Sequence, residues 1–193
     1  MLLSSPSERS RARHLALAYA ELVNSRLDYV AISADTTEAD LKQRRELVPQ
    51  GVSFSDGAVV SSATQGGLLL LDGLERAERN VLPTLNNLLE NREMALEDGR
   101  FLVDARRFEA LKATTGLAAV HRHFRVLALA SPCPPFEGRA LDPPLRSRFQ
   151  ALLVPPAPTE ELTEALLAAG EESVARPLLA AVETLLAARS QAF

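Results

Sequence analysis

An aspartate directly follows four consecutive leucines in this sequence, and that arrangement can place a carboxylate at a ligand-binding edge. The residues Leu68 to Leu71 predict a buried strand, and Asp72 with Gly73 ends it at a turn. In an open sheet of parallel strands, ligands bind outside the carboxyl ends of the strands, where Asp72 would lie. The same pattern also marks an ordinary exit from a strand, so its meaning depends on the neighbouring segments.

Several strands and helices are needed to position this carboxylate. Short aliphatic and β-branched runs predict four buried strands, at residues 28–33, 67–72, 124–130 and 150–154. Apolar residues at helical spacing, together with N-cap signals, predict helices within residues 1–26, from Asp35 to about Leu47, and at 58–64, 80–91, 160–169 and 173–189. Residues 1–26 are rich in serine and arginine, so an organelle transit peptide explains them equally well. Residues 51–57 are expected to form a loop, and residues 105–119 to be helical and then loop-like.

The order of these elements predicts the fold class and the domain boundary. Strands separated by helices indicate a mostly parallel sheet covered on both faces, in the α/β class. A hairpin is expected to project from the core, because Arg92–Leu96 and Arg100–Val103 flank the turn signal Asp98-Gly99. The proline-rich residues 155–158 form a linker. We therefore expect an α/β core at residues 1–154 and a short helical segment at residues 155–193.

The composition excludes several classes of function. The chain has 193 residues, is 47% hydrophobic and carries a net charge of −4, so it has no basic surface that would make nucleic acid or an anionic membrane the default partner. Its single cysteine cannot form an internal disulfide. The apolar runs are far shorter than the roughly 20 residues that span a bilayer. We expect a globular protein of a reducing compartment.

Three segments resemble AAA+ ATPases of the MoxR and dynein-related branch, in the order that these proteins display them. The first is Asp72 to Ala77 leading into a helix, and the second is the strand Phe124–Ala130 followed by Ser131-Pro132. The third is Leu141–Phe149, which closes in Arg148-Phe149. The resemblance implies the P-loop NTPase fold, a three-layer sandwich whose sheet has five strands in the spatial order 5-1-4-3-2.

The resemblance also implies functional residues and cofactors. ATP would bind with Mg²⁺ held near Asp72, and Ser131 would be the sensor near the γ-phosphate. Arg148 would be an arginine finger that acts in trans on a neighbour's nucleotide. An alternative for Arg148 is a structural ion pair with Asp142 or Glu137.

The sequence departs from the family pattern at the parts that perform hydrolysis. A phosphate-binding loop needs glycines and a lysine, whereas residues 1–50 contain no glycine and the segment Ser4–Ser10 has no lysine. Two interpretations stay open for Arg9, Arg11 and Arg13, namely nonspecific contact with phosphate and, as the expectation, solvated side chains. Gly73 stands where active relatives have the catalytic glutamate, so Glu75 would either substitute for it or be a solvated or salt-bridged surface carboxylate. The sequence also predicts that the central first strand is missing and that the helical lid at residues 155–193 is incomplete.

Residues 12–150 also resemble the first AAA unit of the family of von Willebrand factor A domain-containing protein 8, in segments such as Asp35–Glu46 and Glu75–Leu102. That family is large and mitochondrial and has several AAA units. The resemblance implies that the chain is a part of such a protein and that its partners are other AAA units in a ring. Three functions follow as hypotheses, namely an ATP-binding module, a non-catalytic assembly unit, and a truncated fragment without independent activity.

Overall fold

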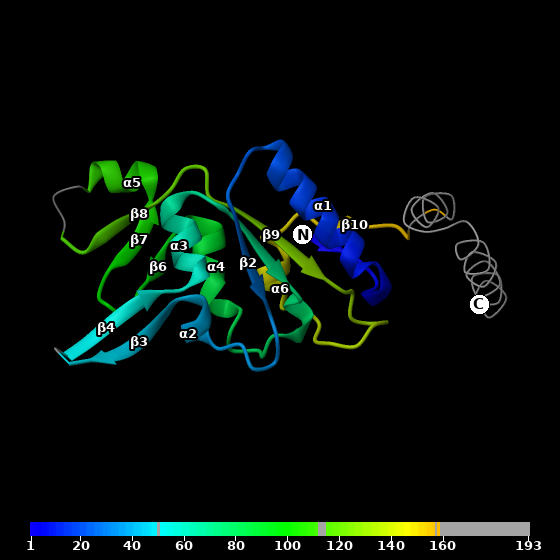
Figure 1. Cartoon of the computed structure of the whole chain (residues 1–193), viewed down its shortest axis with the longest axis horizontal. Coiled ribbons are helices and arrows are strands. Elements are labelled where there is room, and N and C mark those ends of the chain that lie inside the picture. The colour runs from blue at the N-terminus through cyan, green and yellow to red at the C-terminus, as the bar shows by residue number, and fades with distance from the viewer. Residues whose placement is uncertain (50, 112–114, 157, 159–193) are drawn as a thin grey trace, which may run out of the picture. The chain divides into compact units, whose positions relative to one another are not determined.

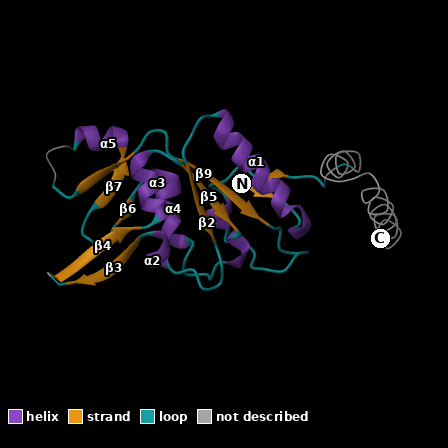
Figure 2. Cartoon of the chain, viewed as in Figure 1, coloured by secondary structure: helices purple, strands orange, loops and turns teal. Residues whose placement is uncertain are grey.

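A five-stranded parallel sheet forms the centre of the fold (Figures 1 and 2). The computed structural model describes residues 1–49, 51–111, 115–156 and 158. The spatial order of the strands is β10-β1-β9-β5-β2. Their bounds are Leu2–Leu3 for β1, Leu27–Ala31 for β2, Leu68–Asp72 for β5, Arg125–Ala130 for β9 and Leu152–Leu153 for β10. The α/β class and the predominantly parallel sheet are therefore confirmed.

Helices cover both faces of this sheet, as the class requires. On one face lies α1 (Arg9–Leu22), which turns its small residues Ala12 and Ala16 toward Leu70 and Leu129. Apolar side chains of α3 (Ala58–Gln65) and α4 (Pro83–Asn91) belong to the core on the other face, together with Leu69 and Leu71. Alternate leucines of β5 thus enter opposite cores, which explains why the run has no polar position.

The prediction that the central first strand is missing was wrong. Leu2 and Leu3 form β1, which pairs in parallel with both β9 and β10 and so occupies the central place between them. Two residues are enough to connect the sheet here because β10 is equally short, and because Leu2 packs with the α1 face while Leu3 packs with the opposite core. The strand was overlooked because two apolar residues carry no periodicity.

The helix predicted to run to about Leu47 was also wrong beyond its first turn. The N-cap signal is confirmed, since Thr37 and Asp40 form a capping box at the start of α2 (Glu38–Leu41). The chain then forms the antiparallel hairpin β3 (Gln43–Val48) and β4 (Gly51–Asp56), so the predicted loop at residues 51–57 is mainly a strand. Most residues of this hairpin are exposed, and an exposed strand lacks the apolar alternation on which the prediction relied.

A second small sheet contains the predicted hairpin. Its strands are β6 (Met94–Ala95), β7 (Phe101–Asp104) and β8 (Leu117–Val120), and β6 and β7 are antiparallel as expected. β8 pairs in parallel with β7 and follows α5 (Ala105–Ala110), so part of the segment expected to be loop-like is a strand. The remaining short helices are η1 (Pro6–Glu8), η2 (Leu74–Arg76) and α6 (Pro143–Arg146).

The chain divides into two compact units, Met1–Val154 and Pro155–Phe193. The helices predicted at residues 160–169 and 173–189 lie outside the described residues. Within the described part of the chain, no helix is long and apolar enough to cross a membrane.

Candidate functional site

Three strands end at the same edge of the sheet and bring polar side chains together there. Because β1, β5 and β9 are parallel neighbours, their carboxyl ends meet. Ser4 follows β1, Asp72 ends β5 and Ser131 follows β9; all three are buried. The chain passes from Ser4 through η1 into α1, whose first residue is Arg9. Asp72 and Ser131, which were predicted at strand ends, therefore lie at one edge of the sheet, and Ser4 and an arginine join them there.

Arg9 bridges the three residues that the resemblance singled out at this edge. Its guanidinium donates from Nη1 to Asp72 Oδ1 at 3.3 Å and from Nη2 to Ser131 Oγ at 2.8 Å. Nη2 also donates to Glu75 Oε1. The Arg9 side chain is only 9% exposed, and Glu75 and Asp72 are 4% and 7% exposed, so these ion pairs are well removed from solvent.

Arg13 and Tyr29 donate hydrogen bonds to the second carboxylate oxygen of Asp72. Arg13 lies one helical turn after Arg9 and donates to Asp72 Oδ2 from Nε at 2.9 Å and from Nη2 at 2.6 Å. The Tyr29 hydroxyl donates to the same oxygen at 2.9 Å. The hydrogen bonds and charge of Asp72 raise the pKa of Arg13, and burial followed by the Asp72 interaction raises the pKa of Tyr29. We call these six residues the Arg9 cluster: Arg9, Arg13, Tyr29, Asp72, Glu75 and Ser131.

The Arg9 cluster does not fit a magnesium nucleotide as it stands. Mg²⁺ requires carboxylate oxygens that are free to coordinate it, whereas both oxygens of Asp72 already accept from cationic or hydroxyl donors. A triphosphate requires uncommitted cations and backbone N–H groups, whereas Arg9 and Arg13 are paired with carboxylates. Within the described residues, no group of three or more His, Cys, Asp or Glu could hold a metal ion.

Three buried polar atoms at the cluster and its approach have no hydrogen-bond partner. They are Ser4 Oγ, Arg9 Nε and Glu75 Oε2. A buried polar atom that pairs with neither protein nor water costs about 1–3 kcal/mol, so each of these atoms is a position where a water or a ligand atom would bind.

The backbone angle of Gly73 and the ion pair of Glu75 limit the roles that these two positions can have. Gly73 has φ +95°, in the left-handed region, and a Cβ there would lie 3.1 Å from the carbonyl oxygen of Ile32. A glutamate at this position would therefore be strained. Glu75 is 3% exposed and salt-bridged to Arg9, so it is not a solvated surface carboxylate.

The loop after β9 closes over Glu75. Arg139 N–H donates to the Glu75 carbonyl oxygen at 2.7 Å. A Cβ on Gly138 would lie 2.8 Å from Glu75 Cγ and 3.0 Å from Cys133 Sγ, which means that the loop backbone packs directly on the glutamate. The thiol of Cys133 has a raised pKa, because of burial and then the nearby charge of Glu75. This close cover holds the Glu75 side chain against Arg9.

Arg148 does not join the Arg9 cluster. Its Nε donates to the Asn86 carbonyl oxygen at 3.0 Å, Nη1 donates to the Pro144 carbonyl oxygen, and Nη2 pairs with Glu90 of α4. The alternative predicted from the sequence, an ion pair of Arg148 with Asp142 or Glu137, was wrong in its partner, which is Glu90. A residue that acts on a neighbour's nucleotide would also be expected away from its own cluster.

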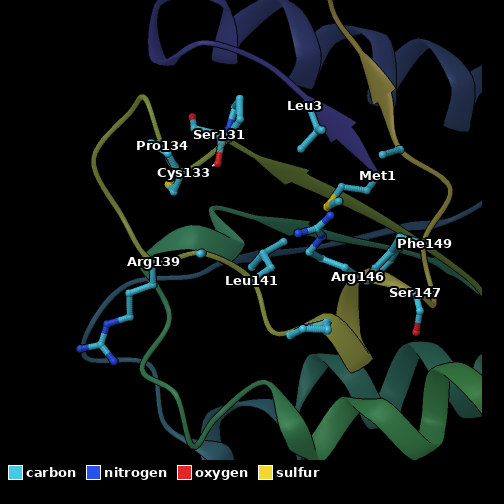
Figure 3. A pocket seen from close by; sticks show the side chains of 14 residues that line it. Met1, Leu3, Ser131, Cys133, Pro134, Arg139, Leu141, Arg146, Ser147 and Phe149 are labelled. Atoms are coloured by element: carbon cyan, nitrogen blue, oxygen red, sulfur yellow. Dashed lines mark hydrogen bonds between the residues drawn. The ribbon is translucent and has the colours of Figure 1, made fainter.

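A separate pocket lies beside the cluster, and only Ser131 is shared between them (Figure 3). Its volume is about 660 Å³, and its walls include Leu3, Leu141 and Phe149, which pack on the core opposite α1. In Figure 3 the Arg146 side chain lies between Leu141 and Phe149. Asp72 and Glu75 do not line this pocket, so its volume adds no room next to the carboxylates.

Sequence reasoning missed Arg9 and Arg13 as parts of the site, since both were expected to be mainly solvated. A signal was available in their spacing. Residues four apart share one face of a helix, so both arginines point to the same sheet edge as soon as α1 is placed after β1. The sequence prediction failed to include the arginines because it did not place β1.

Comparison with known proteins shows the family and supports the fold. Residues 12–149 match the AAA domain family of the dynein-related subfamily, so the match begins inside α1 and leaves out the preceding loop. The chain is 52% identical over 147 residues to von Willebrand factor A domain-containing protein 8 of Mus musculus, covering 72% of this chain and 8% of that protein. It is 33% identical over 107 residues to midasin of Dictyostelium discoideum, covering 53% of this chain and 2% of midasin.

Two further likenesses extend over most of the chain. The denitrification regulatory protein NirQ of Stutzerimonas stutzeri is 28% identical over 187 residues, covering 96% of this chain and 61% of NirQ. The crystal structure of a proposed ATPase from Cytophaga hutchinsonii superposes with a TM-score of 0.56 at 14% identity, covering 86% of this chain and 44% of that one, and so supports the fold. The chain spans only a small part of the first two relatives. By its family match, this chain belongs to the dynein-related subfamily of AAA domains.

Proposed function

We propose that this chain is a non-hydrolysing unit of an AAA+ assembly, which keeps the fold and the assembly surfaces of an ATPase while its own nucleotide position is filled by side chains. The observation that carries the proposal is the guanidinium of Arg9, which contacts Asp72, Glu75 and Ser131 together. These are the residues that would otherwise face magnesium and phosphate. An internal cation thus takes the place of the ligand.

The electrostatics of the cluster support this proposal. The carboxylates of Asp72 and Glu75 are each paired with a buried or half-buried guanidinium, and Arg76 approaches Glu75 at 3.8 Å as well. Breaking a buried ion pair by removing one partner costs about 3–5 kcal/mol. A nucleotide would have to supply this free energy before it gained any contact, and the loop at Ser4–Glu8 offers no lysine or glycine to help.

The role of such a unit would lie in its contacts with neighbouring units. Arg148 would offer its guanidinium to a nucleotide bound by another unit of the parent protein, which would hydrolyse ATP there. The family match supports this role, because it extends to residue 149 and so includes the segment that closes in Arg148-Phe149. The likeness to a family of large mitochondrial proteins supports a mitochondrial location as part of the proposal. Fractionation of cells that express the tagged full-length protein tests that location.

A second candidate function is ATP binding without hydrolysis, and a specific observation favours it. Ser4 Oγ, Arg9 Nε and Glu75 Oε2 have no protein partner within the described residues, so a bound ligand would find polar atoms to pair with there. If Arg9 turned toward a phosphate, Asp72 would lose one cation and gain access to Mg²⁺. The family match supports nucleotide binding in general.

Calorimetric titration of the purified chain with ATP and Mg²⁺ separates the two functions. We expect no binding heat for the wild-type chain and none for Asp72→Asn, which keeps the shape of the side chain but removes its charge. Heat with the wild type that weakens in Asp72→Asn would overturn the proposal and establish the second candidate. Cooperative unfolding of both proteins, followed by circular dichroism, shows that the comparison is between folded chains.

A further inference from the structure

One end of the central sheet is an open strand edge. β2 pairs only with β5 among the described strands. The N–H of Ile32 donates to the Asp72 carbonyl oxygen at 2.8 Å, and the Arg26 carbonyl oxygen accepts from Leu68 N–H at 2.7 Å. In a parallel pair, alternate residues direct their backbone groups to the same neighbour. The even-numbered residues of β2 therefore bond to β5, and the odd-numbered residues direct their N–H and C=O groups away from the sheet.

The outward-facing residues are Leu27, Tyr29 and Ala31, and within the described residues no backbone group pairs with them. Tyr29 is 46% exposed, and Ala31 is exposed as well. Natural sheets usually blunt such an edge with proline, lysine, a bulge or a covering segment. The five residues of β2 contain no proline and no lysine. Asp28 is their one charged residue, and its position in the alternation turns its backbone groups toward β5.

A groove runs along this open edge. It has a volume of about 530 Å³, and its lining includes Tyr29 to Ala31 of β2 and Ser55 to Ala58, at the end of β4 and the start of α3. In Figure 1, the β3–β4 hairpin projects away from the central sheet. Because Tyr29 and Ala31 line the groove, it borders the edge to which a further strand would add.

The charges around the groove select the kind of chain that could enter it. Three aspartates and one arginine line it: Asp35, Asp40, Asp56 and Arg44. Arg44 is neutralised by Asp40 at 2.8 Å, and Asp56 is paired with Arg100 at 2.6 Å. Asp35 is exposed and has no polar side-chain contact within the described residues. The lining is thus net negative, and this complements a basic segment.

We propose that the open edge of β2 binds an extended, lysine- or arginine-rich segment of a partner protein, which adds to the sheet as a further strand. Backbone hydrogen bonds from Tyr29 and Ala31 would provide affinity, and the carboxylate of Asp35, which is unpaired in the described part of the chain, would select basic side chains. The inference is independent of the Arg9 cluster, because it uses backbone groups that point away from that site. It holds whether or not the chain binds a nucleotide.

Fluorescence anisotropy with a labelled synthetic peptide of alternating lysine and valine tests this proposal on the full chain. We expect saturable binding, and no binding of the matched peptide in which glutamate replaces lysine. Ala31→Pro removes one outward N–H and should weaken binding about tenfold, whereas the matched control Ala31→Ser keeps that N–H and should bind as the wild type does. Asp35→Lys should weaken binding several-fold and reduce its dependence on salt.

Three results would overturn the proposal. Equal binding of the lysine and glutamate peptides would contradict the charge selection, and undiminished binding by a folded Ala31→Pro variant would exclude the β2 edge. Self-association of the wild type that Ala31→Pro abolishes would show that a second copy of the chain occupies the edge instead.

A measurement on the wild type keeps the test decisive if Ala31→Pro fails to fold. Amide hydrogen exchange resolved by residue should show new protection of Tyr29 and Ala31 when the lysine peptide binds. Val30 should change little, because its N–H already bonds to β5. Protection without this alternation would contradict strand addition.

Discussion

Two arginines contact the same aspartate in this chain, yet they differ in burial, and this difference makes the role of Arg9 measurable. The Arg9 side chain is 9% exposed, whereas that of Arg13 is 43% exposed. We expect Arg9→Ala to lower the free energy of unfolding by about 3 kcal/mol, because it leaves Asp72 and Glu75 buried without a common cation. Arg13→Ala is the matched control and should cost less than about 1 kcal/mol, since solvent screens its pair. Urea unfolding measures both, and equal losses would contradict the central position of Arg9.

Gly73 gives a second prediction at the scale of single residues. Gly73→Ala should lower the free energy of unfolding by about 1–2 kcal/mol, because alanine is strained in the left-handed region. The close approach of the added Cβ to the Ile32 carbonyl oxygen should increase this loss. Gly99 is the matched control, because it has φ +85° and open space around the added Cβ. Thermal unfolding should therefore show a larger loss for Gly73→Ala than for Gly99→Ala. We also expect no ATPase activity from Gly73→Glu.

At the scale of elements, the contacts of Gln43 explain why the chain after α2 forms a strand and does not continue as a helix. Its side chain donates to Asp56 at 2.7 Å and to Asp98 at 2.9 Å, and it accepts from Glu97 N–H at 2.9 Å, so it ties the hairpin to the neighbouring turn. These partners are distant in sequence, so local helix signals could not reveal them. We expect Gln43→Ala to cost about 2–3 kcal/mol in urea unfolding. The exposed Gln65→Ala is the control and should cost under about 0.5 kcal/mol.

The start of α2 should also make stability depend on pH. Hydrogen bonds from Thr37, then the pair with Arg44, lower the pKa of Asp40 below its ordinary 3.8. A lowered pKa in the folded state means that Asp40 stabilises the fold above about pH 4 and that this contribution is lost as the pH falls through the lowered value. Asp40→Asn should therefore be less stable than the wild type at pH 7, with a smaller difference at pH 3. Chemical unfolding at both pH values measures this, and a constant difference would refute it.

At the scale of the whole molecule, the sequence predicted the buried elements far better than the exposed or short ones. The strand at Leu68–Asp72 and the helix at Pro83–Asn91 were recognisable because burial imposes a pattern on them. The β3–β4 hairpin is mostly exposed, and β1 has two residues, so neither has such a pattern. The site follows the same rule. Asp72 and Ser131 could be placed at one edge from strand order, whereas the contacts of Arg9 depend on where β1 lies.

The last prediction concerns Arg148 in the assembled parent protein. Arg148→Ala should lower ATP turnover about tenfold or more if its guanidinium acts on a neighbour's nucleotide. The same change also removes contacts to Glu90 and to the Asn86 carbonyl oxygen, so it could act simply by loosening α4. Glu90→Ala separates these explanations, because it breaks the ion pair and leaves the guanidinium in place. We expect Glu90→Ala to retain turnover. If both variants lose turnover equally, Arg148 supports the fold and is not an arginine finger, whereas a loss confined to Arg148→Ala would assign the finger to this residue.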